Sequence, residues 1–353
     1  MGCCGGDGFR EEDSLRRYLF YVSLPYSVAI LRPLQAAIHA RGDEVRWFLE
    51  GADASVLDSR DLLISTVEEV KEYSPEAIFV PGNWVPDFFP GAKVQIFHAC
   101  GVGKKGHFRI RGFFDLYCTH GSSTTGPFQK LAEQHGHFHV IETGWPKHDP
   151  LFRGQAAERA DGRPRILYAP TFSPSLTSAP ALCETIARIS ESAGWDWTVK
   201  FHSKMSSEWA SQYVDIQNEN LRVCEDHDLI PLLHWADVVL SDTSSVIYEA
   251  ILADLPVVTF RTDWPGEHLL DVSEPEDLEA AVSAALQRPE DLVNAAGKLI
   301  AEMHPAVDGR ASERVLEATD RLVAGDLPPL KSKPLNLWRR WQVRNRLGYY
   351  HLR

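Results

Sequence analysis

Hydroxyl and carboxylate side chains gather in the short segment Ser241–Ser245, which follows the apolar run Val238–Leu240. Either Ser244 or Ser245 can cap a helix that begins next, because the residues after them recur at helical spacing. Unpaired backbone N–H groups at a helix start, the positive end of its dipole and the two hydroxyls favour a bound phosphate or diphosphate. Asp242 and Thr243 lie in the same turn. Capping turns of this kind also occur in α/β proteins that bind no phosphate. Other motifs of the chain must therefore indicate whether this turn is a phosphate site.

His98 ends an apolar segment and precedes a glycine-rich loop that carries Lys104 and Lys105. A histidine in this place can act as a general base beside an anion-binding nest. A hydrogen-bonded histidine at a strand end, with no catalytic role, is the alternative.

His202 ends the segment Thr198–Phe201 and is followed by Lys204. Imidazole and ammonium groups together suit the neutralisation of charge that grows on a phosphoryl group. Glu249 lies four residues after Ser245, where a carboxylate can reach the ribose hydroxyls of a nucleotide. A charge on an exposed helix face is the alternative for Glu249.

Two further groups of residues suggest weaker sites. Ser312 and Arg314 lie at a turn and helix start, where they can bind another phosphate or serve as an ordinary cap. His135, His137 and His139 alternate along the chain, but no carboxylate or cysteine joins them nearby. We therefore predict no metal site there.

The elements that must position these residues alternate between apolar strands and amphipathic helices, which predicts α/β domains with parallel sheets. Because ligands bind at the carboxyl ends of such strands, two doubly wound domains would face each other across a cleft that forms the active site. In the first half the predicted strands are 17–24, 45–50, 77–80, 93–98, 116–119 and 140–143, with helices at 28–40, 62–72 and 124–134. In the second half the strands are 166–169, 198–201, 221–224, 238–240 and 257–260, with helices near 181–192 and from 274 to 324.

A change in composition divides the halves, since Pro146, Pro150 and the polar stretch 153–164 separate the two strand series. The sequence thus predicts four parts. They are a flexible leader (1–16), an N-terminal acceptor-side domain (17–150), a C-terminal nucleotide-donor domain (151–327) and a basic, aromatic tail (328–353).

Composition excludes several classes of protein. The 353 residues are 44% hydrophobic and 24% charged, as in ordinary globular domains. No apolar run approaches the ~20 residues that span a bilayer, and no signal peptide is evident, which predicts a cytoplasmic location. The six cysteines show neither zinc-finger spacing nor a disulfide framework.

The tail differs in charge from the rest of the chain. The net charge is −13, yet residues 331–353 carry seven Lys or Arg and no Asp or Glu. Aromatic residues such as Trp338 and Trp341 interleave with these bases, which favours contact with the anionic inner face of a membrane. Nucleic acid fits less well, because the acidic body would repel it and no nucleic-acid motif is present. A helix that packs on the body is the other alternative.

Several motifs together resemble the CDP-glycerol glycerophosphotransferase family, which makes teichoic-acid type polymers in the cell envelope. The resemblance extends from about residue 19 to residue 321 and implies the GT-B fold of two Rossmann-like domains. The segments that carry it are Phe97–Gly106, Gly144–Asp149, Leu167–Phe172, Lys200–His202, Ser241–Glu249 and, more weakly, Asp308–Ser312.

The resemblance also implies roles. His98 would be the base on the acceptor hydroxyl, with Lys104, Lys105 and Asp149 on the acceptor side, and His202 would act at the transferring phosphate. The hydroxyl would attack the β-phosphorus of CDP-glycerol and release CMP, without metal or cofactor. Residues implied to bind the nucleotide or its phosphates are Tyr168, Pro170, Thr171, Lys204, Asp242, Thr243, Ser244, Ser245, Glu249, Ser312 and Arg314.

Departures from the family pattern leave the substrates open. His98-Ala-Cys-Gly101 and Pro146-Lys-His-Asp149 replace His-Gly and Pro-Arg-Asn-Asp forms, so a CDP-ribitol or similar CDP-polyol donor fits equally. The acceptor would be a glycan or a lipid-linked molecule. Rival functions are a GT-B glycosyltransferase or epimerase that uses a UDP-sugar, and a non-enzymatic nucleotide-binding protein of an envelope-polymer complex.

Overall fold

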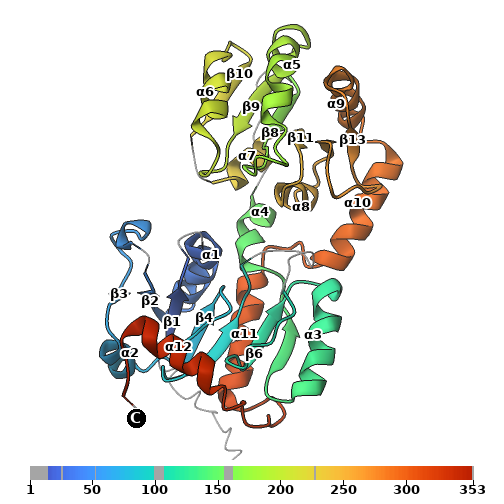
Figure 1. The fold of residues 1–353 in the computed structure, drawn as a ribbon. Coiled ribbons are helices and arrows are strands. Elements are labelled where there is room, and N and C mark those ends of the chain that lie inside the picture. Colours follow the sequence, from blue (N-terminus) through green and yellow to red (C-terminus); the bar gives the residue numbers. More distant parts are fainter. Residues whose placement is uncertain are drawn as a thin grey trace, which may run out of the picture.

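The computed structural model describes residues 15–24, 27–51, 53–98, 107–154, 162–225 and 228–351. Two α/β domains lie one above the other, and the chain passes between them at helix α4 (Asp149–Arg153) and again after helix α10 (Glu290–Met303) (Figure 1). The polypeptide thus crosses twice between the domains.

The first domain holds a seven-stranded parallel sheet in the order β3-β2-β1-β4-β5-β6-β7. Its central strands are apolar on both faces, as a sheet covered on both sides requires. The strands are β1 (Arg17–Val22), β2 (Glu44–Leu49), β3 (Leu63–Ile64), β4 (Ala77–Val80), β5 (Ala92–Gln95), β6 (Leu116–Thr119) and β7 (His139–Glu142).

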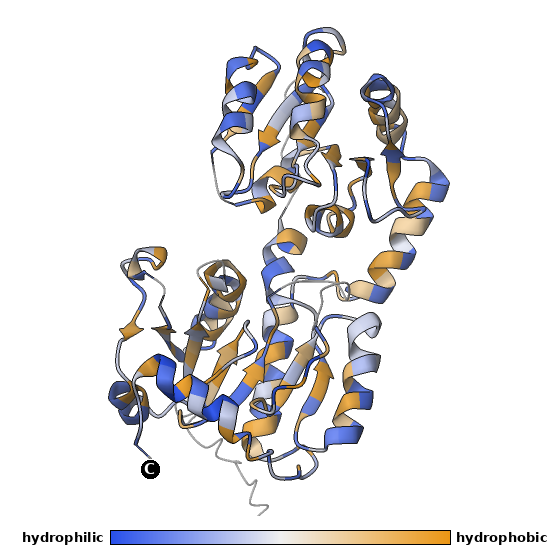
Figure 2. Ribbon diagram, viewed as in Figure 1, coloured by the Kyte–Doolittle hydropathy of each residue, from blue (hydrophilic) through white to orange (hydrophobic). Residues whose placement is uncertain are grey.

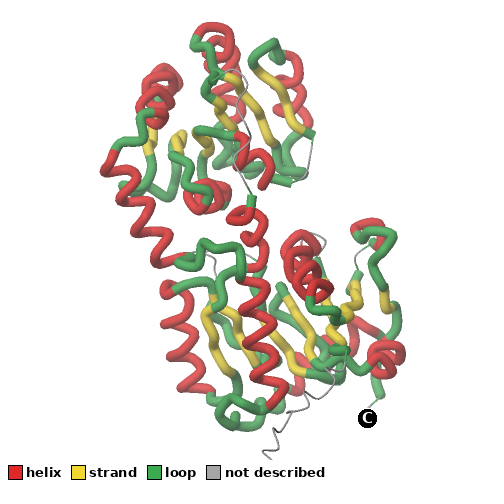
Figure 3. The backbone as a smooth tube through the Cα atoms, turned by 180° about the vertical axis from the view of Figure 1, so that it is seen from behind, coloured by secondary structure: helices red, strands yellow, loops and turns green. Residues whose placement is uncertain are grey.

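Helices from both ends of the chain cover this sheet. One face carries α1 (Ser27–Ala40) and α11 (Ala311–Ala324), which Figure 3 shows from behind. The other face carries α2 (Val67–Tyr73), α3 (Ser122–His135) and α12 (Leu337–Leu347). The short helices η1 (Ala54–Val56) and η2 (Pro146–His148) complete the domain.

The second domain holds a six-stranded parallel sheet in the order β10-β9-β8-β11-β12-β13. Orange apolar segments concentrate in the strands and inner helix faces of both domains (Figure 2). The strands are β8 (Arg165–Tyr168), β9 (Asp196–Lys200), β10 (Leu221–Cys224), β11 (Val238–Ser241), β12 (Val257–Phe260) and β13 (Leu270–Val272). The helices are α5 (Ala179–Ser192), α6 (Ser207–Asp215), α7 (Ile230–Trp235), α8 (Val246–Leu252), η3 (Pro275–Asp277), α9 (Leu278–Leu286) and α10.

Strand order reverses once in each sheet, between β1 and β4 in the first and between β8 and β11 in the second. Doubly wound sheets bind ligands at this point, beyond the carboxyl ends of the strands. The predicted fold class, two Rossmann-like domains, is confirmed.

The packing of the C-terminal segments differs from the expected division of the chain. Val315 and Leu316 of α11 are fully buried in the core of the first domain, although the sequence division placed residues 151–327 in the second. Val343 of α12 and Tyr349 are buried against the other face of the same sheet. Helix amphipathicity alone does not say which sheet a helix will cover, and this is the physical reason for the difference.

Candidate active site

The switch point between β8 and β11 brings two of the predicted motifs into contact. The carboxylate of Asp242, directly after β11, accepts hydrogen bonds from the backbone N–H of Thr171 (2.8 Å) and of Ser178 (2.9 Å). The Ser178 hydroxyl donates a third bond to Asp242 at 2.8 Å. Burial raises the pKa of Asp242, while the bonds from Ser178 and Thr171 oppose that shift. Asp242 is thus a buried tie between loops, whereas the sequence predicted contact with the ligand.

Fewer side chains of the segment after β8 can reach a ligand than the motif suggests. The Tyr168 ring is fully buried, and its hydroxyl lies 2.8 Å from the Ser178 hydroxyl. Pro170 is also buried, and Thr171 is half-buried. Because the Tyr168 ring packs into the core, this segment can offer a ligand its backbone and the Thr171 side chain.

The turn after β11 carries the hydroxyl groups of Thr243, Ser244 and Ser245, of which the two serine hydroxyls lie on its open side. Thr243 is buried and its Oγ1 accepts a hydrogen bond from the Asp263 backbone N–H at 2.9 Å. Ser244 is half-buried, with its Oγ accepting from the Val246 N–H at 3.3 Å, and Ser245 is exposed. Helix α8 has only seven residues, so the hydroxyls of Ser244 and Ser245 matter more here than a long helix dipole.

His202 lies just beyond β9 and packs against Phe172, with 4.5 Å between the ring centroids. Its Nδ1 accepts a hydrogen bond from the Lys204 backbone N–H at 3.1 Å, so a neutral ring carries its proton on Nε2. Partial burial, followed by the charges of Lys204 and Lys200, lowers the pKa of His202. At neutral pH the imidazole is therefore an uncharged donor through Nε2.

Glu249 is buried and is paired with a lysine of the other domain that the sequence analysis did not select. Lys147 of the first domain places its Nζ 2.9 Å and 3.0 Å from the two carboxylate oxygens of Glu249. An ion pair between helix η2 and helix α8 thus connects the two domains beside the Ser244–Ser245 turn.

His98 follows β5 at the carboxyl edge of the first sheet and is half-buried. The preceding residue, Phe97, has a positive φ of 60°, which is strained for an aromatic residue. Its ring stacks on His107 with centroids 5.2 Å apart, and its carbonyl accepts a hydrogen bond from Trp145 Nε1 at 3.2 Å. Buried packing therefore holds the strained backbone directly before His98. Lys104 and Lys105 lie outside the described residues.

Asp149 and Ser312 meet at the connection between the domains. The Asp149 carboxylate accepts hydrogen bonds from the backbone N–H groups of Ala311 (2.7 Å) and Ser312 (2.8 Å), and so caps α11. Arg314 pairs with Asp308. The sequence predicted Asp149 for the acceptor and Ser312 with Arg314 for a phosphate. Since the cap occupies the amides that an anion would need, the structure shows Asp149 and Ser312 tying together the two segments at which the chain crosses between the domains.

Three histidines lie buried beside this connection. The ring centroids of His148 and His304 are 5.2 Å apart, and His304 Nε2 accepts a hydrogen bond from the Trp145 N–H at 2.8 Å. Burial is the main cause that lowers the pKa of His120, His148 and His304. These rings are neutral packing groups at pH 7.

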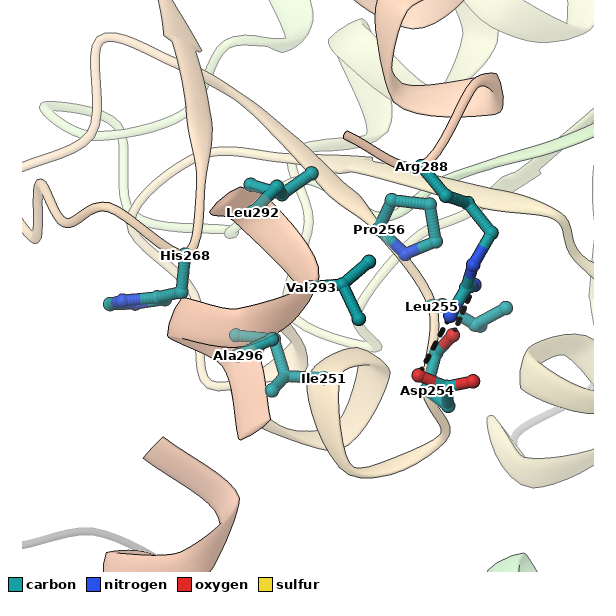
Figure 4. A pocket seen from close by; sticks show the side chains of 9 residues that line it. All are labelled: Ile251, Asp254, Leu255, Pro256, His268, Arg288, Leu292, Val293 and Ala296. Atoms are coloured by element: carbon teal, nitrogen blue, oxygen red, sulfur yellow. Dashed lines mark hydrogen bonds and ion pairs between the residues drawn. The ribbon is translucent and has the colours of Figure 1, made fainter. Parts of the chain in front are cut away.

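Other features lie apart from the cleft. Across the described ranges, no group of three His, Cys, Asp or Glu side chains is placed to hold a metal ion. The small pocket in Figure 4 lies between α8 and α10, where Ile251 and Leu292 help to line it and Arg288 pairs with Asp254 at 2.8 Å. No residue predicted for the site lines that pocket.

Two Rossmann-like sheets with facing carboxyl edges define the GT-B class of fold. Residues 112–268 match the family model described as CDP-Glycerol:Poly(glycerophosphate) glycerophosphotransferase, and this match confirms the family resemblance found in the motifs. A comparison with curated proteins gave no match.

Solved structures support the same fold. A protein assigned as a UDP-N-acetylglucosamine 2-epimerase from Listeria monocytogenes superposes with a TM-score of 0.64 and 14% identity, covering 91% of this chain and 100% of its own. The wall teichoic acid polymerase TagF, in a variant soaked with CDPG, superposes with a TM-score of 0.61 and 15% identity. The match covers 90% of this chain and 92% of TagF. The UDP-GlcNAc 2-epimerase from Neisseria meningitidis bound to UDP-GlcNAc superposes with a TM-score of 0.61 and 13% identity. The match covers 86% of this chain and 100% of the epimerase.

Proposed function

We propose that this protein transfers glycerol phosphate from CDP-glycerol to a hydroxyl group of a cell-envelope glycan or lipid-linked acceptor. The observation that carries the proposal is the Asp242 carboxylate, which ties Thr171 and Ser178 to the turn that holds Ser244 and Ser245. A crevice prebuilt in this way, at the switch point of the second sheet, suits a nucleotide diphosphate.

In the proposed reaction His98 accepts the proton of the acceptor hydroxyl, whose oxygen then bonds to the β-phosphorus. The bond from that phosphorus to the bridging oxygen breaks, and CMP leaves with the electron pair. The strained backbone at Phe97, whose carbonyl accepts a hydrogen bond from Trp145, would restrict the orientation of His98 at the edge of the first sheet. Fixed orientation of the base lowers the entropic cost of the proton transfer.

His202 contributes from the facing domain. Its Nδ1 is held by the Lys204 backbone, so the Nε2–H can donate to a phosphoryl oxygen as negative charge builds. The ammonium group of Lys204, which lies 5.7 Å from the centre of the Phe172 ring, adds positive charge on the same loop. These groups and the Ser244 and Ser245 hydroxyls supply the electrostatic stabilisation that phosphoryl transfer needs.

The histidine pair has a parallel in the teichoic acid polymerase. Two of its histidines were varied in the solved structures, and they lie as far apart in that chain as His98 and His202 lie in this one. At 14–15% identity such equal spacing supports two matching positions, one in each domain.

The test is a donor screen scored by the nucleotide released. CDP-glycerol, CDP-ribitol and UDP-N-acetylglucosamine would each be incubated with the protein and membrane extract. We expect CMP from CDP-glycerol in an acceptor-dependent reaction. No CMP from either CDP-polyol, together with turnover of the UDP-sugar, would contradict the proposal and favour the rival that the epimerase neighbours suggest.

We further propose that the protein works at the cytoplasmic face of an anionic membrane. Leu335, Leu337 and Trp338 are about 70% exposed, and the stacked ring of Trp341 is 49% exposed. Aromatic and aliphatic side chains beside basic residues are typical of helices that lie in the membrane interface. No helix in the described ranges has the length and hydrophobicity to cross a bilayer.

Point variants test this contact better than deletion of the tail, because Val343 and Tyr349 are buried in the first domain. We expect Trp338→Ser with Trp341→Ser to reduce binding to vesicles of phosphatidylcholine and phosphatidylglycerol at low salt. Trp264→Ser, at a tryptophan of the second domain with 41% exposure, is the matched control. Equal vesicle binding by all three proteins would refute the membrane contact.

A further inference from the structure

The loop that follows β12 is tied to the turn that we assign to the donor phosphates. The backbone N–H of Asp263 donates a hydrogen bond to the Thr243 hydroxyl at 2.9 Å, and Thr243 directly precedes Ser244. Within the loop, the Thr262 hydroxyl accepts a hydrogen bond from the Trp264 N–H at 3.2 Å. Because β11 and β12 are neighbouring parallel strands, the loop and the turn lie at the same carboxyl edge of the sheet. The loop is therefore in direct contact with the proposed phosphate site.

Trp264 gives this loop an exposed aromatic surface. Its ring stacks on Tyr248 of α8, with 5.9 Å between the ring centroids and 26° between the ring planes. Tyr248 lies three residues after Ser245, and the residue that follows it, Glu249, pairs with Lys147 of the first domain. Trp264 remains 41% exposed, so Tyr248 supports the ring without covering it. An apolar surface is thus held beside the start of α8, where this helix contacts the first domain.

The backbone of this loop begins with the same unusual conformation as the backbone before His98. Arg261, which follows β12, has a positive φ of 51°, and Phe97 has one of 60°. Strands β5 and β12 hold equivalent places, since each is the second strand beyond the switch point of its sheet. Positive φ values are unfavourable for such residues and cluster at ligand sites. The shared strain supports a ligand-binding role for the loop after β12.

The charges of the loop favour an uncharged ligand group with hydroxyls. Asp263 and Glu267 are exposed. Arg261 does not offset them locally, because its guanidinium donates to the Ser273 carbonyl at 2.6 Å and lies 3.7 Å from Glu274. A further phosphate would be repelled here. A polyol, in contrast, can donate hydrogen bonds from its hydroxyls to the carboxylate of Asp263 and pack its C–H groups against the indole face.

The position of the loop matches the end of the donor that carries the polyol. Thr171, which we assign to the nucleotide, follows β8 on one side of the turn after β11, and the loop after β12 lies on the other side. A donor whose diphosphate lies at Ser244 and Ser245 would extend its nucleotide towards β8 and its polyol towards β12. The polyol would then meet the loop that carries Trp264.

We propose that Trp264, positioned by Tyr248, contacts the polyol of the donor and selects its length. The indole ring packs against a short polyol and excludes the additional carbon atoms of a longer one. A difference of one methylene group in an apolar site changes specificity by roughly 10- to 200-fold, so a single ring suffices for this selection. The inference rests on the proposed transfer reaction and names the residue that determines its donor specificity.

The experiment compares CDP-glycerol with CDP-ribitol, whose polyol is longer. We expect Trp264→Ser to lower the ratio of kcat/KM for CDP-glycerol to that for CDP-ribitol by about 10-fold, because the indole contact is lost and room for the longer chain is created. Trp264→Phe keeps an aromatic face and should hold the ratio within about threefold of the wild-type value. Val214→Ser, which also removes an exposed apolar side chain from the second domain, is the matched control and should leave the ratio unchanged.

Calorimetry separates this inference from the proposed function. Trp264→Ser should bind CDP-glycerol about 10-fold more weakly than the wild type does, and it should bind CMP, which has no polyol, equally well. That result without any CMP release by the wild type would overturn the transfer reaction and keep the polyol site. An unchanged donor ratio, or equal losses of affinity for CMP and CDP-glycerol, would overturn the site. A higher KM for the acceptor with unchanged donor constants would assign the ring to the acceptor and contradict the proposal.

Discussion

The two domains share one strand order around the switch point, yet they are completed by different parts of the chain. In the second domain, Asp242 ties the loops after β8 and β11 with three hydrogen bonds, all within residues 171–242. In the first domain, α11 covers part of one face of the sheet and α12 part of the other, and both helices come from the C-terminal part of the chain. The site that we assign to the donor is thus held together within its own domain, whereas the domain that we assign to the acceptor also needs the residues of α11 and α12.

This difference has a functional meaning. A crevice fixed by short-range hydrogen bonds suits one constant ligand, the nucleotide diphosphate. A surface that includes α12 can change its substrate through that helix while the chemistry that we propose at His98 and His202 stays the same. We therefore expect donor-side changes to alter nucleotide binding, and acceptor-side changes to alter turnover or the KM for the acceptor.

The largest expected effect concerns the acceptor side. His98→Ala should lower kcat by about 1000-fold, because it removes the proposed general base, while CMP affinity measured by calorimetry should stay unchanged. His39→Ala, at an exposed histidine near the end of α1, should leave kcat at the wild-type value. If His98→Ala turns over normally, the base lies elsewhere.

Asp242 offers the corresponding test on the donor side. Asp242→Ala leaves three donors of Thr171 and Ser178 without an acceptor, so we expect a loss of about 3 kcal/mol in the free energy of unfolding. CMP affinity should fall as well, and Asp242→Asn should cost less because it keeps one acceptor oxygen. Urea unfolding and calorimetry measure the two quantities. An Asp242→Ala protein with wild-type stability and affinity would show that the crevice is not prebuilt by this carboxylate.

The connection between the domains should be sensitive to acid. Burial lowers the folded-state pKa of His120, His148 and His304, so the unfolded chain binds more protons below a pH of about 6.5. Stability is then present at neutral pH and is lost as pH falls, by up to about 1.4 kcal/mol per pH unit for each histidine. Urea unfolding at pH 7 and pH 5.5 measures the slope. His148→Gln should reduce it, and an unchanged slope would show that His148 does not contribute.

The smallest expected effect lies at the ion pair that joins the domains. Lys147 pairs with the Glu249 carboxylate, which we assign to binding the ribose hydroxyls. Because Lys147 competes with the ribose for this carboxylate, Lys147→Ala should tighten CMP binding by about 3-fold. Glu249→Gln should weaken CMP binding. Calorimetry with CMP compares the two variants, and weaker binding by Lys147→Ala would instead mean that Lys147 contacts the nucleotide.

The strands could be predicted because each depends on a local pattern. The segments 77–80, 116–119, 221–224 and 257–260 agree with the predicted bounds, since their apolar runs are flanked by turn residues. The short strands β3 and β13 were missed, because Leu63–Ile64 falls inside the predicted helix 62–72 and Leu270–Val272 is only partly buried. Pattern also indicated the Ser241–Ser245 turn and the two strand-end histidines.

The remaining features arise from contacts between residues far apart in the sequence. Asp149 looks like a site residue in its motif, and only the fold shows that it caps α11. Lys147 lay within the quoted motif, yet its partner Glu249 comes from the other domain. The positive φ of Phe97 could not be predicted from the sequence, because phenylalanine ordinarily avoids this backbone conformation. Each of these depends on tertiary packing that periodicity does not encode.

One measurement tests most directly whether both domains act on a single transition state. Acceptor-dependent CMP release from CDP-glycerol would be compared in the wild type, His98→Ala, His202→Ala and the double variant. If the two histidines act together, the double variant should be about as slow as the slower single variant, because residues that act as a unit have non-additive effects. Losses that simply multiply, or single variants with undiminished CMP release, would contradict a shared reaction in the cleft.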